Sequence, residues 1–123
     1  MSAEILAIDD SRTIRELVKA VLGDAGFAVT TAEDGVLGVE AFAGKRFDTV
    51  ITDINMPNMD GFGVIESIRR GTVNRRVPIL VLTTESGPAL KDRARKAGAT
   101  GWIVKPFDDA ELVDVCRQVS GAA

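Results

Sequence analysis

The sequence contains no histidine and no tyrosine, and its only indole is that of Trp102. The absence of histidine excludes a serine–histidine–aspartate triad, histidine ligation of a metal and general-base catalysis by an imidazole. The candidate functional groups are accordingly carboxylates, hydroxyls and an amine, with Trp102 as the one aromatic residue among them.

Cysteine is also scarce, and the chain has no long apolar run. The single Cys116 rules out an internal disulfide, which is typical of a protein from a reducing compartment, so we expect a cytoplasmic location. Residues 1–8 lack the basic segment and long apolar run of a signal peptide. Since no stretch approaches the ~20 apolar residues that a membrane-spanning helix needs, we expect no membrane association.

The size and charge of the chain indicate an ordinary globular domain. Its 123 residues are 46% hydrophobic and 27% charged, with a formal net charge of −3. A mildly acidic chain lacks the basic footprint of a nucleic-acid-binding protein, so we expect no nucleic-acid partner. We predict a single domain over residues 1–123, monomeric and without an output domain.

Short apolar runs alternate with amphipathic segments along the chain. The runs predict strands at residues 5–8, 29–32, 49–52, 77–83 and 101–104. Apolar residues at helical spacing follow each of them and predict five helices, the fourth opened by Pro88. The continuous apolar run VPILVLT, residues 77–83, is typical of a central strand covered on both faces.

Five strand–helix units with short links predict an α/β fold. The expected architecture is a doubly wound, five-stranded parallel sheet of order 2-1-3-4-5, flavodoxin-like, with helices on both faces. In such a sheet the ligand site lies beyond the carboxyl ends of the strands, at the switch point between the first and third.

Polar residues stand at the ends of four of the five expected strands. Each alone has an ordinary explanation, such as a helix cap or the start of a turn. Because the carboxyl ends of parallel strands meet at one edge of the sheet, we expect these residues to form a functional cluster. They are Asp9 and Asp10 after the first strand, Asp53 after the third, Thr83 and Thr84 at the fourth, and Lys105 after the fifth.

Clustered carboxylates require a compensating charge. Two unit charges ~4 Å apart repel by ~4 kcal/mol at an effective dielectric constant of ~20, so one acid takes up a proton or a cation lies among them. Oxygen ligands favour Mg²⁺, which Asp10, Asp53 and a backbone carbonyl just after Asp53 would partly surround, with Asp9 acting through water. A carboxylate is also a competent nucleophile toward phosphorus, and the metal, Lys105 and Thr83 would then stabilise the phosphoryl charge.

Four sequence blocks carry a resemblance to a known family. They are DDSRTIR (residues 9–15), DINMPNMDG (53–61), LTTES (82–86) and WIVKPF (102–107). In this order they closely resemble the receiver domain of two-component response regulators, and within it the single-domain chemotaxis regulators of the CheY type. The resemblance covers essentially the whole chain.

The resemblance implies a role for each matching residue. Asp53 resembles the phosphoacceptor, charged by a phosphohistidine on a partner kinase. Asp9 and Asp10 resemble the Mg²⁺-binding acids, with the Asn55 backbone carbonyl as a further metal contact. Thr83 resembles the switch hydroxyl, and Lys105 resembles the lysine that pairs with the phosphoryl group and precedes a cis proline.

Four further positions would tune or transmit the signal. Asn55 and Glu85 resemble the pair that sets phosphoryl lifetime in chemotaxis regulators. Trp102 stands where the family commonly has a tyrosine or phenylalanine switch residue, and its larger indole restricts rotation. Thr84 stands where the family often has alanine or glycine, so the resemblance implies that its extra methyl and hydroxyl would narrow the access of water and phosphodonors to Asp53.

The resemblance also implies partners and an output. It implies a signalling protein with self-phosphorylation and autodephosphorylation only, not an enzyme acting on other substrates. Its signal would leave through the face formed by the fourth helix, fifth strand and fifth helix. The implied partners are a chemotaxis-type histidine kinase, a flagellar motor switch protein and a phosphatase.

Three alternative functions remain open on the sequence. A phosphorelay intermediate would pass phosphate to another histidine protein instead of binding a motor. An aspartate-based phosphohydrolase would need a second acid where this chain has Asn55. A flavodoxin-type FMN binder would need a hydroxyl-rich loop where residues 9–11 read DDS, whose charges repel phosphate.

A basic cluster follows the third expected helix and is typical of cations near a helix C-terminus. It consists of Arg69, Arg70, Arg75 and Arg76.

Overall fold

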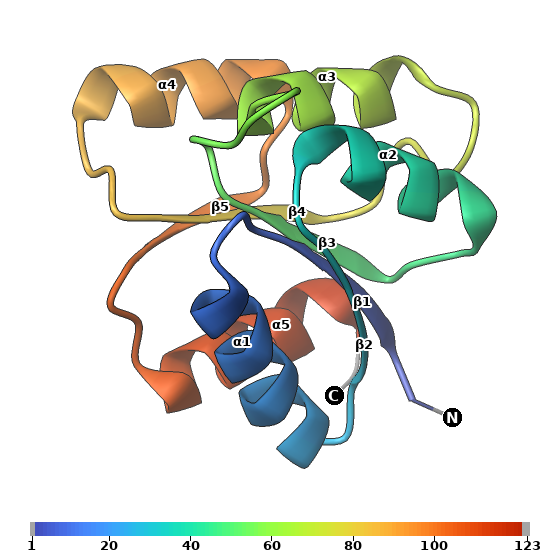
Figure 1. The fold of residues 1–123 in the computed structure, drawn as a ribbon, viewed down its shortest axis with the longest axis vertical. Coiled ribbons are helices and arrows are strands. Elements are labelled where there is room, and N and C mark those ends of the chain that lie inside the picture. Colours follow the sequence, from blue (N-terminus) through green and yellow to red (C-terminus); the bar gives the residue numbers. More distant parts are fainter. Residues whose placement is uncertain (1, 122–123) are drawn as a thin grey trace.

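The computed structural model describes residues 2–121, so residues 1 and 122–123 of the predicted domain lie outside the described part (Figure 1). Within it, five strands alternate with five helices. The strands are β1 (Glu4–Ile8), β2 (Ala28–Ala32), β3 (Thr49–Thr52), β4 (Ile79–Thr83) and β5 (Gly101–Val104). The helices are α1 (Arg12–Asp24), α2 (Gly35–Gly44), α3 (Gly61–Arg70), α4 (Pro88–Ala97) and α5 (Asp109–Ser120).

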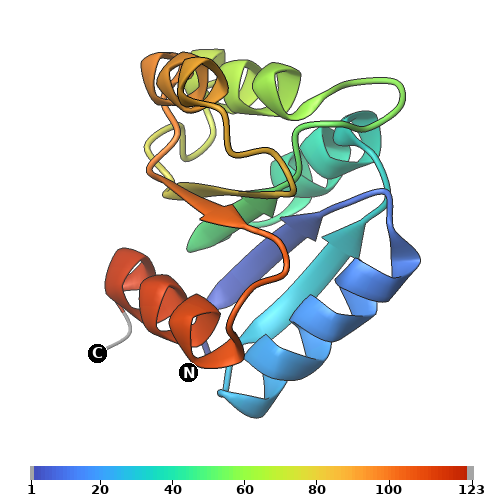
Figure 2. The ribbon, with the colours of Figure 1, turned by 90° about the vertical axis from the view of Figure 1, so that its left-hand side faces the viewer.

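The strands form one sheet of order β2-β1-β3-β4-β5, and every neighbouring pair is parallel. Helices α1 and α5 cover one face, and α2, α3 and α4 cover the other (Figures 1 and 2). The predicted doubly wound fold is therefore confirmed, and the carboxyl ends of β1 and β3 lie side by side at the switch point.

Two apolar layers hold the helices to the sheet. One contains side chains such as Phe42, Ile65 and Val81 beneath α2, α3 and α4. The other contains Val18, Leu22 and Leu112 beneath α1 and α5. Every residue of β3 and β4 is buried, as expected for central strands covered on both faces.

Strand β4 begins two residues later than the apolar run predicts. Pro78 has no N–H to donate to a neighbouring strand, and the N–H of Val77 instead donates to the Asn74 carbonyl in a turn. The apolar run at residues 77–78 thus belongs to the loop before β4, although Val77 is buried in the core. Among the described residues, no helix combines the length and apolar character needed to cross a membrane.

Candidate functional site

The acidic residues converge at one edge of the sheet. Ile8 pairs with Thr52, so the residues that follow, Asp9 and Asp53, emerge together. Their backbones stay in register beyond the strands, because the Asp53 N–H donates to the Ile8 carbonyl at 3.0 Å. Carboxylate oxygens of Asp9, Asp10 and Asp53 lie within 4.8 Å of one another. Asp9 and Asp53 are only 4% and 8% exposed, whereas Asp10 faces solvent.

Lys105 supplies the compensating charge within the chain. Its Nζ lies 2.7 Å from Asp9 Oδ2 and 2.9 Å from Asp53 Oδ2. The lysine reaches this position because β5 lies beside β4, and the Lys105 N–H extends the pairing by donating to the Thr83 carbonyl at 2.8 Å. One ammonium therefore bridges two carboxylates that come from different strands.

Burial and ion pairing have opposite effects on the pKa of Asp9 and on the pKa of Lys105. Burial raises the pKa of Asp9 above its ordinary value, and the hydrogen bonds from Lys105 and the Ser11 N–H offset only part of that rise. Burial by itself lowers the pKa of Lys105. Hydrogen bonds and charge attraction from Asp9 and Asp53 together raise that pKa by more than burial lowers it, so it lies above the ordinary value. Lys105 therefore remains protonated at neutral pH.

The loop after β3 holds the Asp53 carboxylate from its other side. Oδ1 of Asp53 accepts a 2.6 Å hydrogen bond from the Ile54 N–H. The loop closes where the Gly61 N–H donates to the Ile54 carbonyl at 2.8 Å. A Cβ at Gly61 would overlap the Asp53 carbonyl oxygen, so this position requires glycine for lack of space.

Glu85 connects the predicted tuning and switch residues. Its carboxylate accepts a 3.3 Å hydrogen bond from the Asn55 side chain, and its N–H donates to the fully buried Thr83 hydroxyl at 3.4 Å. Its carbonyl accepts a 3.0 Å bond from Nε1 of Trp102. Thr84, between Thr83 and Glu85, is exposed.

Trp102 lies half-buried against the core beneath α3 and α4. Its bond to Glu85 ties β5 to the loop after β4, at the edge of the acidic cluster. The Lys105–Pro106 peptide bond is cis, as the resemblance implies. The structure thus brings Asp9, Asp10, Asp53 and Lys105 together. Glu85 links the side chains of Asn55, Thr83 and Trp102, whereas Thr84 faces solvent.

Two supporting contacts were not predicted from the sequence. Nη1 of Arg15 donates to the Asp9 carbonyl at 2.8 Å, which anchors the Asp9 backbone to α1. Because helical side chains point back toward the N-terminus, a long cation one turn into α1 is a signal that could have identified this contact. Asn58, in the left-handed region at φ 68°, donates to the Asp34 carboxylate at 2.9 Å and so ties the loop after β3 to α2.

The donor set fits a hard divalent cation. Three carboxylates within reach of one another offer oxygen ligands only, and the exposed Asp10 leaves one side open to solvent. An Asp9–Asp10–Asp53 cluster with these properties is compatible with Mg²⁺ binding.

Comparison with known proteins identifies the family. A family model described as the response regulator receiver domain matches residues 5–117. The chain belongs to the response regulator receiver family.

Three similar proteins place it more closely within that family. Chemotaxis protein CheY-3 of Vibrio cholerae is 39% identical over 110 residues, which are 89% of this chain and 85% of that protein. The solved structure of Vibrio cholerae chemotaxis protein CheY4 has a TM-score of 0.92 and 42% identity, and the match covers 97% of this chain and 99% of that one. The receiver domain of a sensor histidine kinase from Pseudomonas aeruginosa, solved with magnesium in its active-site cleft, has a TM-score of 0.90 and 30% identity, covering 98% and 99%. The chain is thus a CheY-like receiver, a signalling domain.

Proposed function

We propose that the chain is a stand-alone response regulator that accepts a phosphoryl group from a histidine kinase on Asp53. The observation that carries this proposal is the bridge from Lys105 to both Asp9 and Asp53 at the carboxyl edge of the sheet. This bridge places the buried Asp53 carboxylate beside an ammonium and two further acids, Asp9 and Asp10, in a chain of the receiver family.

The transfer would proceed by nucleophilic attack. An oxygen of the Asp53 carboxylate forms a bond to phosphorus while the bond from phosphorus to the kinase histidine nitrogen breaks. The electron pair leaves with the imidazole, which takes up a proton. Lys105, already 2.9 Å from Asp53 Oδ2, would stay protonated and stabilise the negative charge on the phosphoryl oxygens.

Mg²⁺ would be held by Asp9, Asp10, Asp53 and the Asn55 carbonyl. Bound there, it would neutralise charge on the transferred group. The magnesium in the Pseudomonas aeruginosa receiver supports this assignment. Asp9 is shared between the metal and Lys105, so the two cations would together balance the three acids and the phosphoryl group.

Phosphorylation would shift the equilibrium between two conformations. The Thr83 hydroxyl, now accepting from the Glu85 N–H, would gain a phosphoryl oxygen as partner in only one of them. Since Glu85 also bonds Trp102, a movement of Thr83 would be transmitted to β5. Asn55 and Glu85, hydrogen-bonded across the site, would set access of water to Asp53, with exposed Thr84 beside them.

The output would be the α4-β5-α5 face. A hollow of about 200 Å³ lies beside Trp102, lined also by Lys91, Ala94 and Thr100. The similarity to Vibrio cholerae chemotaxis proteins favours a flagellar motor switch protein as the target, a chemotaxis-type kinase as donor and a cytoplasmic setting. A phosphatase would assist the return to the resting state.

Mass spectrometry after incubation with acetyl phosphate and Mg²⁺ tests the acceptor. We expect one alkali-labile phosphoryl group on the protein, none on Asp53→Asn and none when the metal is chelated. Asp24→Asn, which changes an exposed acid at the end of α1, is the matched control and should be labelled like the unchanged protein. Equal labelling of Asp53→Asn would refute the assignment.

Binding assays then test the output. The phosphorylated protein should bind a motor-switch fragment more tightly than the unphosphorylated protein does. Unchanged affinity, together with phosphate transfer to a histidine phosphotransfer protein, would replace the motor output by the relay function.

A further inference from the structure

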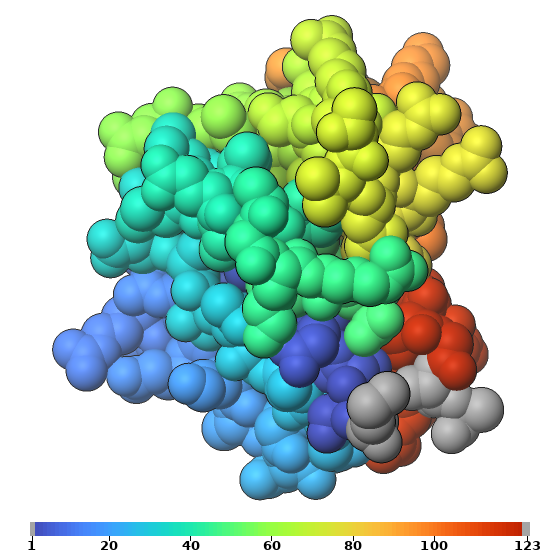
Figure 3. All heavy atoms as spheres, turned by 90° about the vertical axis from the view of Figure 1, so that its right-hand side faces the viewer, coloured from blue at the N-terminus to red at the C-terminus, as the bar shows by residue number. Residues whose placement is uncertain are grey.

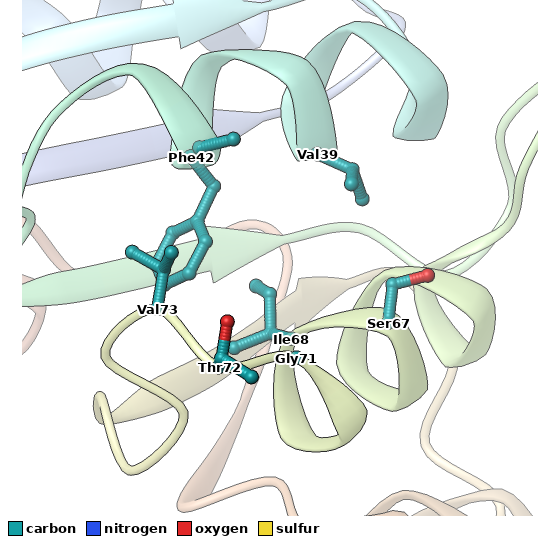
Figure 4. A pocket seen from close by; sticks show the side chains of 8 residues that line it. Val39, Phe42, Ser67, Ile68, Gly71, Thr72 and Val73 are labelled. Carbon is teal, nitrogen blue, oxygen red and sulfur yellow. The ribbon is translucent and has the colours of Figure 1, made fainter.

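A groove lies between the C-terminal ends of α2 and α3, at the end of the sheet away from Asp53. It holds about 170 Å³ and is lined by Val39, Phe42 and Ala43 of α2, Ser67 and Ile68 of α3, and residues 71–73 of the following loop. Figure 4 shows Val39 and Phe42 on one side and Ile68 on the other, with Val73 beside the Phe42 ring. In Figure 3 the end of α2 lies beside the loop before β4.

Helix α2 also exposes apolar side chains outside the groove. Helix α2, GVLGVEAFAG, contains one charged residue, Glu40, and its exposed side includes Val36 and Leu37 at 38% and 40% exposure. A surface helix ordinarily presents a polar outer face. Val73 is 49% exposed, so an apolar side chain stands in solvent at the rim of an apolar hollow.

The loop that carries Val73 is held in place by polar contacts, most of them partly buried. The Arg69 guanidinium donates to the carbonyls of Arg75 and Val77, both at 2.7 Å, and to that of Gly98. Asn74, in the left-handed region at φ 45°, donates from its side chain to the Phe47 carbonyl at 2.7 Å. The exposure of Val73 is therefore built into an anchored loop, which reduces the entropy lost when a ligand covers it.

Cations surround this groove. The Asn74–Phe47 bond joins the two loops that carry them, so both groups flank the same end of α2 and α3. Lys45 lies over the Phe47 ring, which stacks on Phe42 in the groove wall. The exposed cations of this rim are Arg46 before β3, Arg70 at the end of α3, and Arg75 and Arg76 in the loop before β4; Lys45, also exposed, already pairs with Glu4 at 2.7 Å.

We propose that this groove is a docking site for an acidic segment of a partner protein, which inserts an apolar side chain between α2 and α3. The apolar walls accept the anchor, and the cationic rim complements carboxylates on either side of it. The site is separate from the phosphorylation site, so it would recruit a partner without using the α4-β5-α5 face.

Other occupants fit less well. A symmetric dimer through this groove would bring the two cationic rims together, and like charges oppose such a contact. A single-stranded nucleic acid would need exposed aromatic rings for base stacking, whereas Phe42 is only 5% exposed.

A peptide titration monitored by NMR tests the proposal. The probe is a ten-residue peptide with a Leu–Phe centre flanked by Asp and Glu, added to the ¹⁵N-labelled full chain. We expect amide shifts at Val39, Phe42 and Val73 and weaker binding at high salt. The same peptide with an Ala–Ala centre should bind roughly tenfold more weakly, because it lacks the anchor.

Two variants and one control define the site. Val73→Asp, at an exposed position, should weaken binding roughly tenfold by removing the apolar rim and repelling the peptide. Arg75→Glu combined with Arg76→Glu should weaken it by a similar factor, roughly tenfold, and reduce its salt dependence. Leu17→Asp is the matched control, since Leu17 is 43% exposed on α1 across the sheet, and it should leave binding unchanged.

Each alternative result overturns the proposal. Shifts confined to another face, or binding that survives Val73→Asp, would remove the groove as the site. A dimer that is seen by sedimentation and disrupted by Val73→Asp would make a second copy the occupant. Equal binding of oligo-dT to the same residues would indicate a polyanion surface without apolar selection.

Discussion

Trp102 is hydrogen-bonded through its indole Nε1 to the Glu85 backbone carbonyl, at 3.0 Å. The N–H of Glu85 donates in turn to the buried Thr83 hydroxyl. A chain of two bonds therefore joins the end of β4, beside Asp53 and Lys105, to the half-buried aromatic residue of β5.

This arrangement makes Trp102 fluorescence a reporter of phosphorylation, because the chain has no other tryptophan. Acetyl phosphate with Mg²⁺ should change the emission as Thr83 and Glu85 rearrange and the indole bond alters. Thr83→Val retains the shape of the side chain but lacks the hydroxyl, so its emission should stay constant while mass spectrometry still shows phosphorylation. An emission change in Thr83→Val equal to that of the unchanged protein would contradict this coupling.

Lys105→Met should destabilise the domain when metal is absent. It leaves Asp9 and Asp53 buried without their shared counter-charge, and the ion-pair side chains are at most 11% exposed. We expect a loss of about 3 kcal/mol in unfolding free energy, measured by urea titration with EDTA. Mg²⁺ should recover part of it by supplying another cation.

The pH dependence of this contribution follows from the raised pKa of Lys105. The stability that the ion pair contributes is fully present below the ordinary lysine pKa and is lost as the pH rises through the raised pKa in the folded state.

Lys91→Met, at an exposed lysine of α4, is the control for Lys105→Met and should change stability by less than about 0.5 kcal/mol. A similarly small loss for Lys105→Met would show that the buried pair contributes little.

Gly61→Ala should disturb the position of Asp53 as well as stability. The new Cβ overlaps the Asp53 carbonyl oxygen, so the loop after β3 must shift, at a cost of roughly 1–3 kcal/mol. Both the melting temperature and the rate of labelling by acetyl phosphate should fall.

Gly44→Ala provides the matched glycine control. Gly44 ends α2, and a Cβ there meets no atom within 4 Å. Because alanine also reduces the conformational entropy of the unfolded chain, we expect stability to be unchanged or higher by about 0.5 kcal/mol. If both substitutions had the same effect, the crowding at Gly61 would not be the cause.

Cys116 should be unreactive in the folded protein. Cys116 lies on α5, where packing against the sheet leaves it 0% exposed and raises the pKa of its thiol to about 12. At about pH 8 only about one thiol in ten thousand is then thiolate. A disulfide reagent should therefore label it only in denaturant; rapid labelling of the folded protein would show that α5 opens readily.

Much of the site was predictable because its arrangement follows from local pattern and parallel topology. Asp9 and Asp53 each follow a strand, and parallel pairing of β1 with β3 places such residues side by side. The predicted cluster of Asp9, Asp10 and Asp53 is confirmed as a spatial group. Its metal binding and the role of Asp53 as phosphoacceptor stay predictions.

Other contacts could not be read from the sequence. Arg69 was interpreted as one of several cations near a helix end, but its guanidinium reaches across to the Gly98 carbonyl. That contact depends on the distance between α3 and α4. This distance is set jointly by the side chains that pack between the helices and the sheet. The extra loop residues before β4 similarly result from Pro78, whose effect on pairing appears only once its neighbour strand is placed.

The sequence by itself determined the five strand–helix units, the sheet order and the identity of the acidic cluster, because hydrophobic periodicity and the handedness of crossovers act along short stretches of chain. Only the tertiary structure decided that Lys105 bridges Asp9 and Asp53, that Trp102 bonds Glu85, and that an anchored loop holds Val73 over an apolar groove. These contacts join residues distant in sequence, and distances of a few ångströms between them are fixed only when all the layers pack at once.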